Sequence, residues 1–127
     1  MGALILDASV LIGLLDTADS HHGRAIDDVE VADREGDQLL LPASAYSETL
    51  VAFARARRIQ EAREAITSMG ITVVSLTDTI AERAAELRAH HRQLRLPDAI
   101  VLATAQELGG RLLSYDRGLS RLAGKTA

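Results

Sequence analysis

The chain of 127 residues has no cysteine and no tryptophan, and it holds one phenylalanine and two tyrosines. Without cysteine it has no disulfide, no zinc–thiolate site and no thiol nucleophile. Its core must be aliphatic, because hydrophobic residues still make up 47% of the sequence. Every apolar run is far shorter than the roughly 20 residues that span a bilayer. No basic segment precedes the first apolar run, so we expect no secretory signal and a cytoplasmic location.

Lysine is almost absent, since Lys125 is the only one and the other basic residues are all arginines. The net charge of −4 argues against a protein that wraps duplex DNA by bulk electrostatics. The arginines cluster within 55–63 and 83–95, where they either pair with glutamates at helical spacing or contact phosphate. Charge patterns of this kind favour solvated helix faces over a dedicated nucleic-acid surface.

Short apolar runs alternate with segments of helical periodicity along the whole chain. Strands separated by helices pair in parallel through right-handed crossovers, which predicts a three-layer α/β/α domain with a mainly parallel sheet over residues 1–127. The sequence predicts strands at 3–6, 38–41, 71–74 and 112–114, and helices at about 9–15, 20–36, 44–57, 59–68, 78–91, 98–108 and 117–122.

Four acidic residues lie where apolar runs end or helices begin. Asp7 and Asp116 follow the first and last predicted strands, and Glu48 and Asp98 lie on the first turns of helices that start at the same edge. Taken alone, each has an ordinary role as a helix cap, a turn residue or a solvated helix residue. The functional crevice of a parallel sheet lies at the carboxyl ends of its strands, so the topology predicts that the four carboxylates meet.

Carboxylates gathered in this way repel one another unless a cation compensates them. An all-oxygen set of ligands suits Mg²⁺ or Mn²⁺, which activates water for the hydrolysis of a phosphodiester. We expect Asp7 and Asp98 to be direct ligands, and Glu48 and Asp116 to ligate directly or through water. Ser9 is placed to hydrogen-bond a carboxylate or a metal-bound water.

A family resemblance rests on four short segments in order. The resemblance covers essentially the whole chain, and it is to the acidic motifs of PIN-domain nucleases, with the small size of a VapC-type toxin. The segments are Ile5-Leu6-Asp7-Ala8-Ser9-Val10-Leu11, Ser44-Ala45-Tyr46-Ser47-Glu48, Leu96-Pro97-Asp98-Ala99 and Leu113-Ser114-Tyr115-Asp116-Arg117.

The resemblance implies a Mg²⁺- or Mn²⁺-dependent endoribonuclease that forms a homodimer and is silenced by a VapB-type antitoxin. Asp7, Glu48, Asp98 and Asp116 match the acidic positions of the family. Ser9 matches a small hydroxyl residue two positions after the first Asp. Ser114 stands where Thr is common, two residues before the last Asp, and it is expected beside Ser9 in a supporting shell.

The sequence allows more than one role for the residues that could contact RNA or a partner protein. Arg95 and Arg117 either reach a phosphate near the metals or are ordinary surface arginines. The apolar residues of helices 9–15 and 44–57 either line a groove for an amphipathic antitoxin segment or fill the core or a homodimer contact.

Two other classes of function remain as alternatives. A phospho-acceptor receiver domain also has acidic residues at strand ends, but this chain has no lysine near a late strand. A non-catalytic regulatory module would use the acidic cluster to bind a metal or the arginines of a partner. The histidine pairs His21-His22 and His90-His91 are expected at the surface, because adjacent helical side chains point in different directions.

Overall fold

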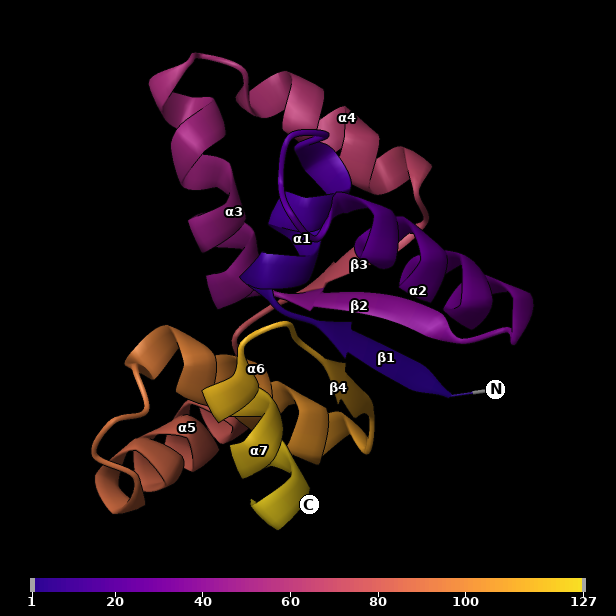
Figure 1. Ribbon diagram of the computed structural model, residues 1–127. Helices are drawn as coiled ribbons and strands as arrows, with labels where there is room; N and C mark the ends of the chain where they lie inside the picture. Colours follow the sequence, from indigo (N-terminus) through magenta and orange to yellow (C-terminus); the bar gives the residue numbers. More distant parts are fainter. Residues whose placement is uncertain (1, 127) are drawn as a thin grey trace.

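The computed structural model describes residues 2–126, which form a four-stranded parallel sheet covered by helices (Figure 1). The strand order is β3-β2-β1-β4. The strands are β1 (Ala3–Leu6), β2 (Gln38–Pro42), β3 (Ile71–Val74) and β4 (Arg111–Leu113). The helices are α1 (Ala8–Leu15), α2 (His22–Arg34), α3 (Ala43–Arg55), α4 (Ile59–Ser68), α5 (Asp78–His90), α6 (Leu96–Leu108) and α7 (Arg117–Thr126).

The direction of the crossovers decides which helices cover which face of the sheet. From β1 through β2 to β3 the chain moves one way, and it then passes back across the sheet to place β4 beside β1. Parallel crossovers are right-handed, so the return runs over the opposite face. Figure 1 accordingly shows α1 to α4 on one side of the sheet and α5 to α7 on the other. The predicted three-layer α/β/α fold is confirmed.

β1 lies at the centre of the sheet and is covered on both faces. Its residues Leu4, Ile5 and Leu6 are 3%, 0% and 0% exposed, so the strand is a continuous apolar run rather than an alternating one. The register pairs Leu6 with Leu113 of β4. The next residue of each strand therefore emerges at the same carboxyl edge, and the Asp7 amide donates to the Leu113 carbonyl at 3.3 Å.

Two glycines allow β4 to run close beside β1. Gly109 ends α6 in the left-handed conformation with φ of 64°, where a side chain would be strained. At Gly110 a Cβ atom would lie 2.9 Å from the carbonyl oxygen of Ala3, closer than side chains approach. The same two glycines therefore end α6 and allow β4 to pair with β1.

Some element boundaries differ from the prediction. α3 ends two residues earlier than predicted, because Arg57 adopts a φ of 57° that interrupts the helix. α2 begins later than predicted, because the Asp19 carboxylate accepts from the His21 amide and holds a turn there. Glu48 lies in the second turn of α3 rather than the first, because this helix already starts at Ala43.

Candidate active site

Asp7 directly follows β1 at the point where the strand order reverses. The chain leaves β1 toward β2 and comes back last to β4, so the switch point of this sheet lies between β1 and β4. Crevices of open parallel sheets form at such points. Asp7 is the N-cap of α1, accepting from the Val10 amide at 3.2 Å, and it is only 4% exposed. It is therefore a helix cap and a buried carboxylate at once.

Two serine hydroxyls connect Asp7 to the loop after β4. Ser9 Oγ donates to Asp7 Oδ1 at 2.6 Å and accepts from the Tyr115 amide at 3.0 Å. Ser114 Oγ donates to Asp7 Oδ2 and accepts from the Asp116 amide at 3.0 Å. Each hydroxyl thus forms a hydrogen-bond relay, in which it accepts a bond from a backbone amide and donates a bond to one carboxylate oxygen of Asp7. The relays fix the orientation of Asp7 and hold the start of α1 against the start of α7.

The buried position of Asp7 shifts the pKa of its carboxyl group. Burial raises the pKa of this carboxyl above its ordinary value, and the nearby charge of Asp98 raises it slightly further. The hydrogen bonds from Ser114, Ser9 and the Val10 amide lower the pKa but do not outweigh burial. A cation that approaches Asp7 therefore stabilises its anionic form.

Glu48 and Asp98 come from different helices and share one arginine. Arg95 Nη2 lies 3.3 Å from Glu48 Oε2, and Arg95 Nε lies 3.2 Å from Asp98 Oδ2. Asp98 stands in the first turn of α6, which packs against α3 where Glu48 lies. The Arg95 side chain is 64% exposed, so the pairing is a surface interaction of small stability.

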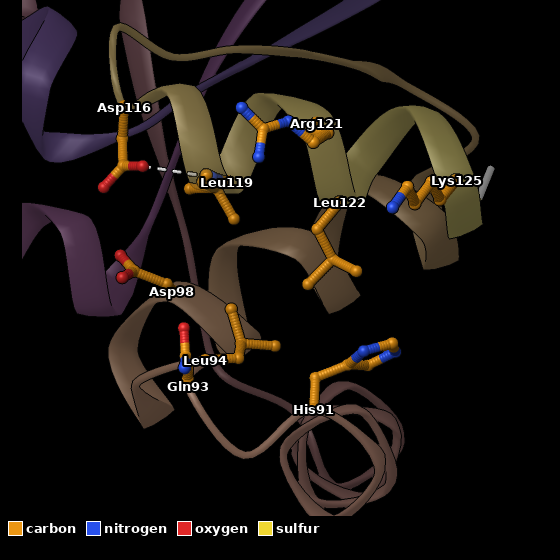
Figure 2. A pocket seen from close by; sticks show the side chains of 10 residues that line it. His91, Gln93, Leu94, Asp98, Asp116, Leu119, Arg121, Leu122 and Lys125 are labelled. Carbon is orange, nitrogen blue, oxygen red and sulfur yellow. Dashed lines mark hydrogen bonds between the residues drawn. The ribbon is translucent and has the colours of Figure 1, made fainter.

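Asp116 and Asp98 line the same cavity, whose volume is about 390 Å³ (Figure 2). Asp116 is positioned by accepting from the Leu119 amide at 3.0 Å, which caps the first turn of α7. In Figure 2 the two carboxylates lie at the left of the cavity, with Lys125 and His91 at the right. Asp116 therefore caps α7 and lines the cavity at the same time.

The four predicted carboxylates are linked through Asp98. Its charge acts on Asp7, it shares Arg95 with Glu48, and it shares a cavity with Asp116. Among residues 2–126, however, no three Asp, Glu or His side chains stand close enough together to hold one metal ion. The all-oxygen donor set and the cost of charge at Asp7 suit a hard cation. Holding one ion in common requires side-chain movement, above all of Arg95.

The two arginines proposed as phosphate contacts have different surroundings from those expected. Arg95 is engaged by Glu48 and Asp98. Arg117 is exposed and is not among the residues that line the cavity, whereas Arg121 and Lys125 are. The spacing of four residues from Arg117 to Arg121 and from Arg121 to Lys125 was visible in the sequence, but the predicted helix stopped before Lys125.

A cluster around Tyr115 was not predicted. The His21 ring stacks on the Tyr115 ring with centroids 4.8 Å apart, and the Arg24 guanidinium lies 4.6 Å from the same centroid. The Tyr115 hydroxyl donates to Asp28 Oδ2 at 2.8 Å, and burial together with this bond raises the pKa of the phenol. The cluster ties the loop after β4 to α2. No local pattern could reveal it, since the partners lie 87 or more residues apart.

Comparisons with known proteins agree with this geometry. A family model described as the PIN domain matches residues 4–125. No curated protein matches the chain significantly. Of the helices within residues 2–126, none has both the length and the apolar character needed to cross a bilayer.

Several solved structures share the fold. A toxin–antitoxin complex from Klebsiella pneumoniae is 25% identical with a TM-score of 0.69, over 89% of this chain and 86% of that chain. VapC20 of Mycobacterium tuberculosis, described as a toxin that cleaves the sarcin–ricin loop, is 20% identical with a TM-score of 0.75, over 94% of both chains. VapBC2 of Rickettsia felis, bound to a DNA fragment from its promoter, is 10% identical with a TM-score of 0.75, over 94% of this chain and 92% of that chain.

Proposed function

Because the chain belongs to the PIN-domain family, we propose that it is a metal-dependent endoribonuclease and the toxin of a VapBC-type toxin–antitoxin pair. The observation that carries the proposal is the buried Asp7 carboxylate, held by two serines beside Asp98 at the switch point of the sheet. A carboxylate buried at such cost and so firmly oriented is typical of a functional site. The fold is shared with VapC20 and with toxin–antitoxin complexes, which supports the same assignment.

In this proposal Asp7 and Asp98 hold Mg²⁺ or Mn²⁺, and Glu48 and Asp116 contribute directly or through water. When bound, such an ion lowers the pKa of a water molecule and neutralises charge on the phosphate. The residues of the chain orient the site. Ser9 and Ser114 prevent the Asp7 carboxylate from rotating, and their hydroxyl protons point at its two oxygens.

Arg95 supplies the positive charge for Glu48 and Asp98 in the absence of an ion. Because its side chain is 64% exposed, its bonds exchange readily with water and with a competing cation. Once displaced from the carboxylates, the guanidinium is free to contact a substrate phosphate, for which its planar donors are well suited.

The partners we propose are a VapB-type antitoxin and a second copy of the chain. The support is an exposed apolar side chain on each of two helices that pack together, α1 and α3. Ile12 and Val51 are 40% and 46% exposed, so these helices carry apolar side chains beyond those that the core needs. Of the two alternatives left open for the apolar residues of α1, Leu11 takes the core, because it is fully buried. An amphipathic partner helix would cover the exposed residues.

The test is cleavage of single-stranded RNA by the purified chain in Mg²⁺ or Mn²⁺, with EDTA as the negative control. Asp98→Asn removes one charge while keeping the shape, and it should lower the rate by at least about 100-fold. Asp33→Asn makes the same change on exposed Asp33 in the last turn of α2 and should leave the rate unchanged.

Two results would contradict the proposal in different ways. Near wild-type cleavage by Asp98→Asn would mean that the carboxylates are not the site. A wild-type chain that binds the ions but cleaves no RNA in either metal would favour the regulatory module.

A further inference from the structure

Helix α7 presents a basic side beyond the carboxylates. Arg117, Arg121 and Lys125 follow one another at intervals of four, so they share one side of the helix. Arg121 and Lys125 line the 390 Å³ cavity together with Asp98 and Asp116. The last turn of α7, which the sequence did not predict, is the turn that carries Lys125.

The apolar side of α7 fixes the position of these cations. Leu119 is 4% exposed, and Leu122 and Ala123 pack against the same cluster. In Figure 2, Leu119 and Leu122 point from α7 into the cavity, while Arg121 and Lys125 lie along the same helix. The buried residues of this cluster are Ile80, Ala84, Leu94, Ala99, Leu102, Ala103 and Leu119. The basic side chains thus belong to a helix whose position is held by packing against this apolar cluster.

The charges of Arg121 and Lys125 have no acidic partner within residues 2–126. Among residues 2–126 neither side chain has a salt bridge, although Arg58, Arg83 and Arg111 are each paired with an acidic residue. Two unpaired cations on one cavity wall, next to two carboxylates, make the cavity positive at one end and negative at the other. Such a wall attracts an anion that extends away from the carboxylates.

On the basis of the proposed endoribonuclease activity, we propose that Arg121 and Lys125 each bind one backbone phosphate of single-stranded RNA, adjacent to the phosphate that is cleaved. Both side chains are cations that pair with phosphate oxygens, and phosphate contacts carry no sequence information, so the contact is to the backbone and independent of sequence. Gln93 and His91 line the opposite wall and supply further hydrogen-bonding groups. In this arrangement Arg121 and Lys125, and not Arg117, guide the strand into the site.

The test is the binding of a fluorescein-labelled single-stranded RNA of about 12 nucleotides, in EDTA, at salt concentrations from about 50 to 200 mM. The double variant Arg121→Gln/Lys125→Gln should bind about tenfold more weakly. Its plot of log affinity against log salt should be less steep by about 1.4, because each phosphate contact to a single strand contributes about 0.7. Arg121→Lys keeps the charge and should retain the salt slope, which a merely structural role for Arg121 would not predict.

Arg34→Gln is the matched control, because Arg34 is exposed at the end of α2. This helix leads into the start of β2, whereas the proposed site lies at the carboxyl ends of the strands. The Arg34→Gln variant should bind like wild type, and an equal loss in this control would overturn the proposal. If the double variant has a lower melting temperature than the wild type, Lys125→Gln alone is measured in its place. Its plot of log affinity against log salt should be less steep by about 0.7.

The remaining outcomes separate this inference from the proposed function. Wild-type affinity and salt slope in the double variant, with metal-dependent cleavage intact in the wild-type chain, would overturn the phosphate contact alone. No binding and no cleavage of RNA by the wild-type chain would overturn the proposed function and this inference with it.

Discussion

Replacing Ser114 with alanine removes one of the two relays on Asp7. The change leaves Asp7 Oδ2 without its hydroxyl donor and the Asp116 amide without its acceptor. Asp7 is 4% exposed, so water replaces the lost bond to its Oδ2 poorly. We therefore expect a clear loss of stability from the removal of a single oxygen atom.

The size of the loss follows from the charge of the acceptor. A hydrogen bond to a charged group contributes about 1.5–3 kcal/mol, and we take about 2 kcal/mol for this site. With an unfolding entropy of about 2.1 cal/mol/K per residue, a loss of about 2 kcal/mol lowers the melting temperature of a chain of this length by about 7 °C. Thermal unfolding followed by circular dichroism in EDTA measures this shift.

The loss of stability in Ser114→Ala should be larger at neutral pH than at acid pH. Burial places the pKa of folded Asp7 above its unfolded value, so the folded state binds a proton more tightly than the unfolded state. The contribution of Asp7 to stability is thus most favourable below its unfolded pKa, and it declines as the pH rises through the folded pKa. Because Ser114 lowers this pKa by stabilising the anion, Ser114→Ala should cost more at pH 7 than near pH 4.

Two further variants complete the experiment. Ser68→Ala removes an exposed hydroxyl that donates to the Ala65 carbonyl one turn earlier in α4, and it should leave the melting temperature nearly unchanged. Ser114→Thr keeps the hydroxyl and should restore most of the loss. A melting temperature of Ser114→Ala equal to wild type at pH 7 would refute the reasoning, since Asp7 would then not depend on the relay.

Three further outcomes are expected. Millimolar Mn²⁺ or Mg²⁺ should raise the melting temperature of the wild-type chain by mass action, and calorimetric titration without binding at these concentrations would contradict the proposed metal site. Arg95→Gln should tighten Mn²⁺ binding severalfold, because it removes the cation that competes for Glu48 and Asp98. The same variant should change the melting temperature without metal by less than about 4 °C. An unchanged Mn²⁺ affinity would mean that Arg95 does not compete with the ion. A small protein encoded immediately upstream should co-purify with this chain and suppress its ribonuclease activity, and failure on both counts would remove the toxin–antitoxin assignment while leaving the nuclease.

The sequence by itself determined the layers of the fold and the residues at the sheet edge. Short apolar runs separated by amphipathic helices admit few packings, and the continuous run of β1 already required cover on both faces. Pro97 near the start of α6 and Gly109 at its end marked that helix, because proline and glycine act locally. The positions of Asp7 and Asp98 at element boundaries were visible for the same reason.

Tertiary structure alone decided how those residues meet. The strand order places the switch point between β1 and β4, and no local pattern specifies which parallel strands become neighbours. Ser9 reaches the Tyr115 amide across 106 residues, and Arg95 reaches Glu48 across 47. Contacts of this kind depend on the packing of whole elements and on side-chain geometry. Periodicity and capping report only on a residue's nearest neighbours along the chain, so the carboxylates could be predicted but their partners could not.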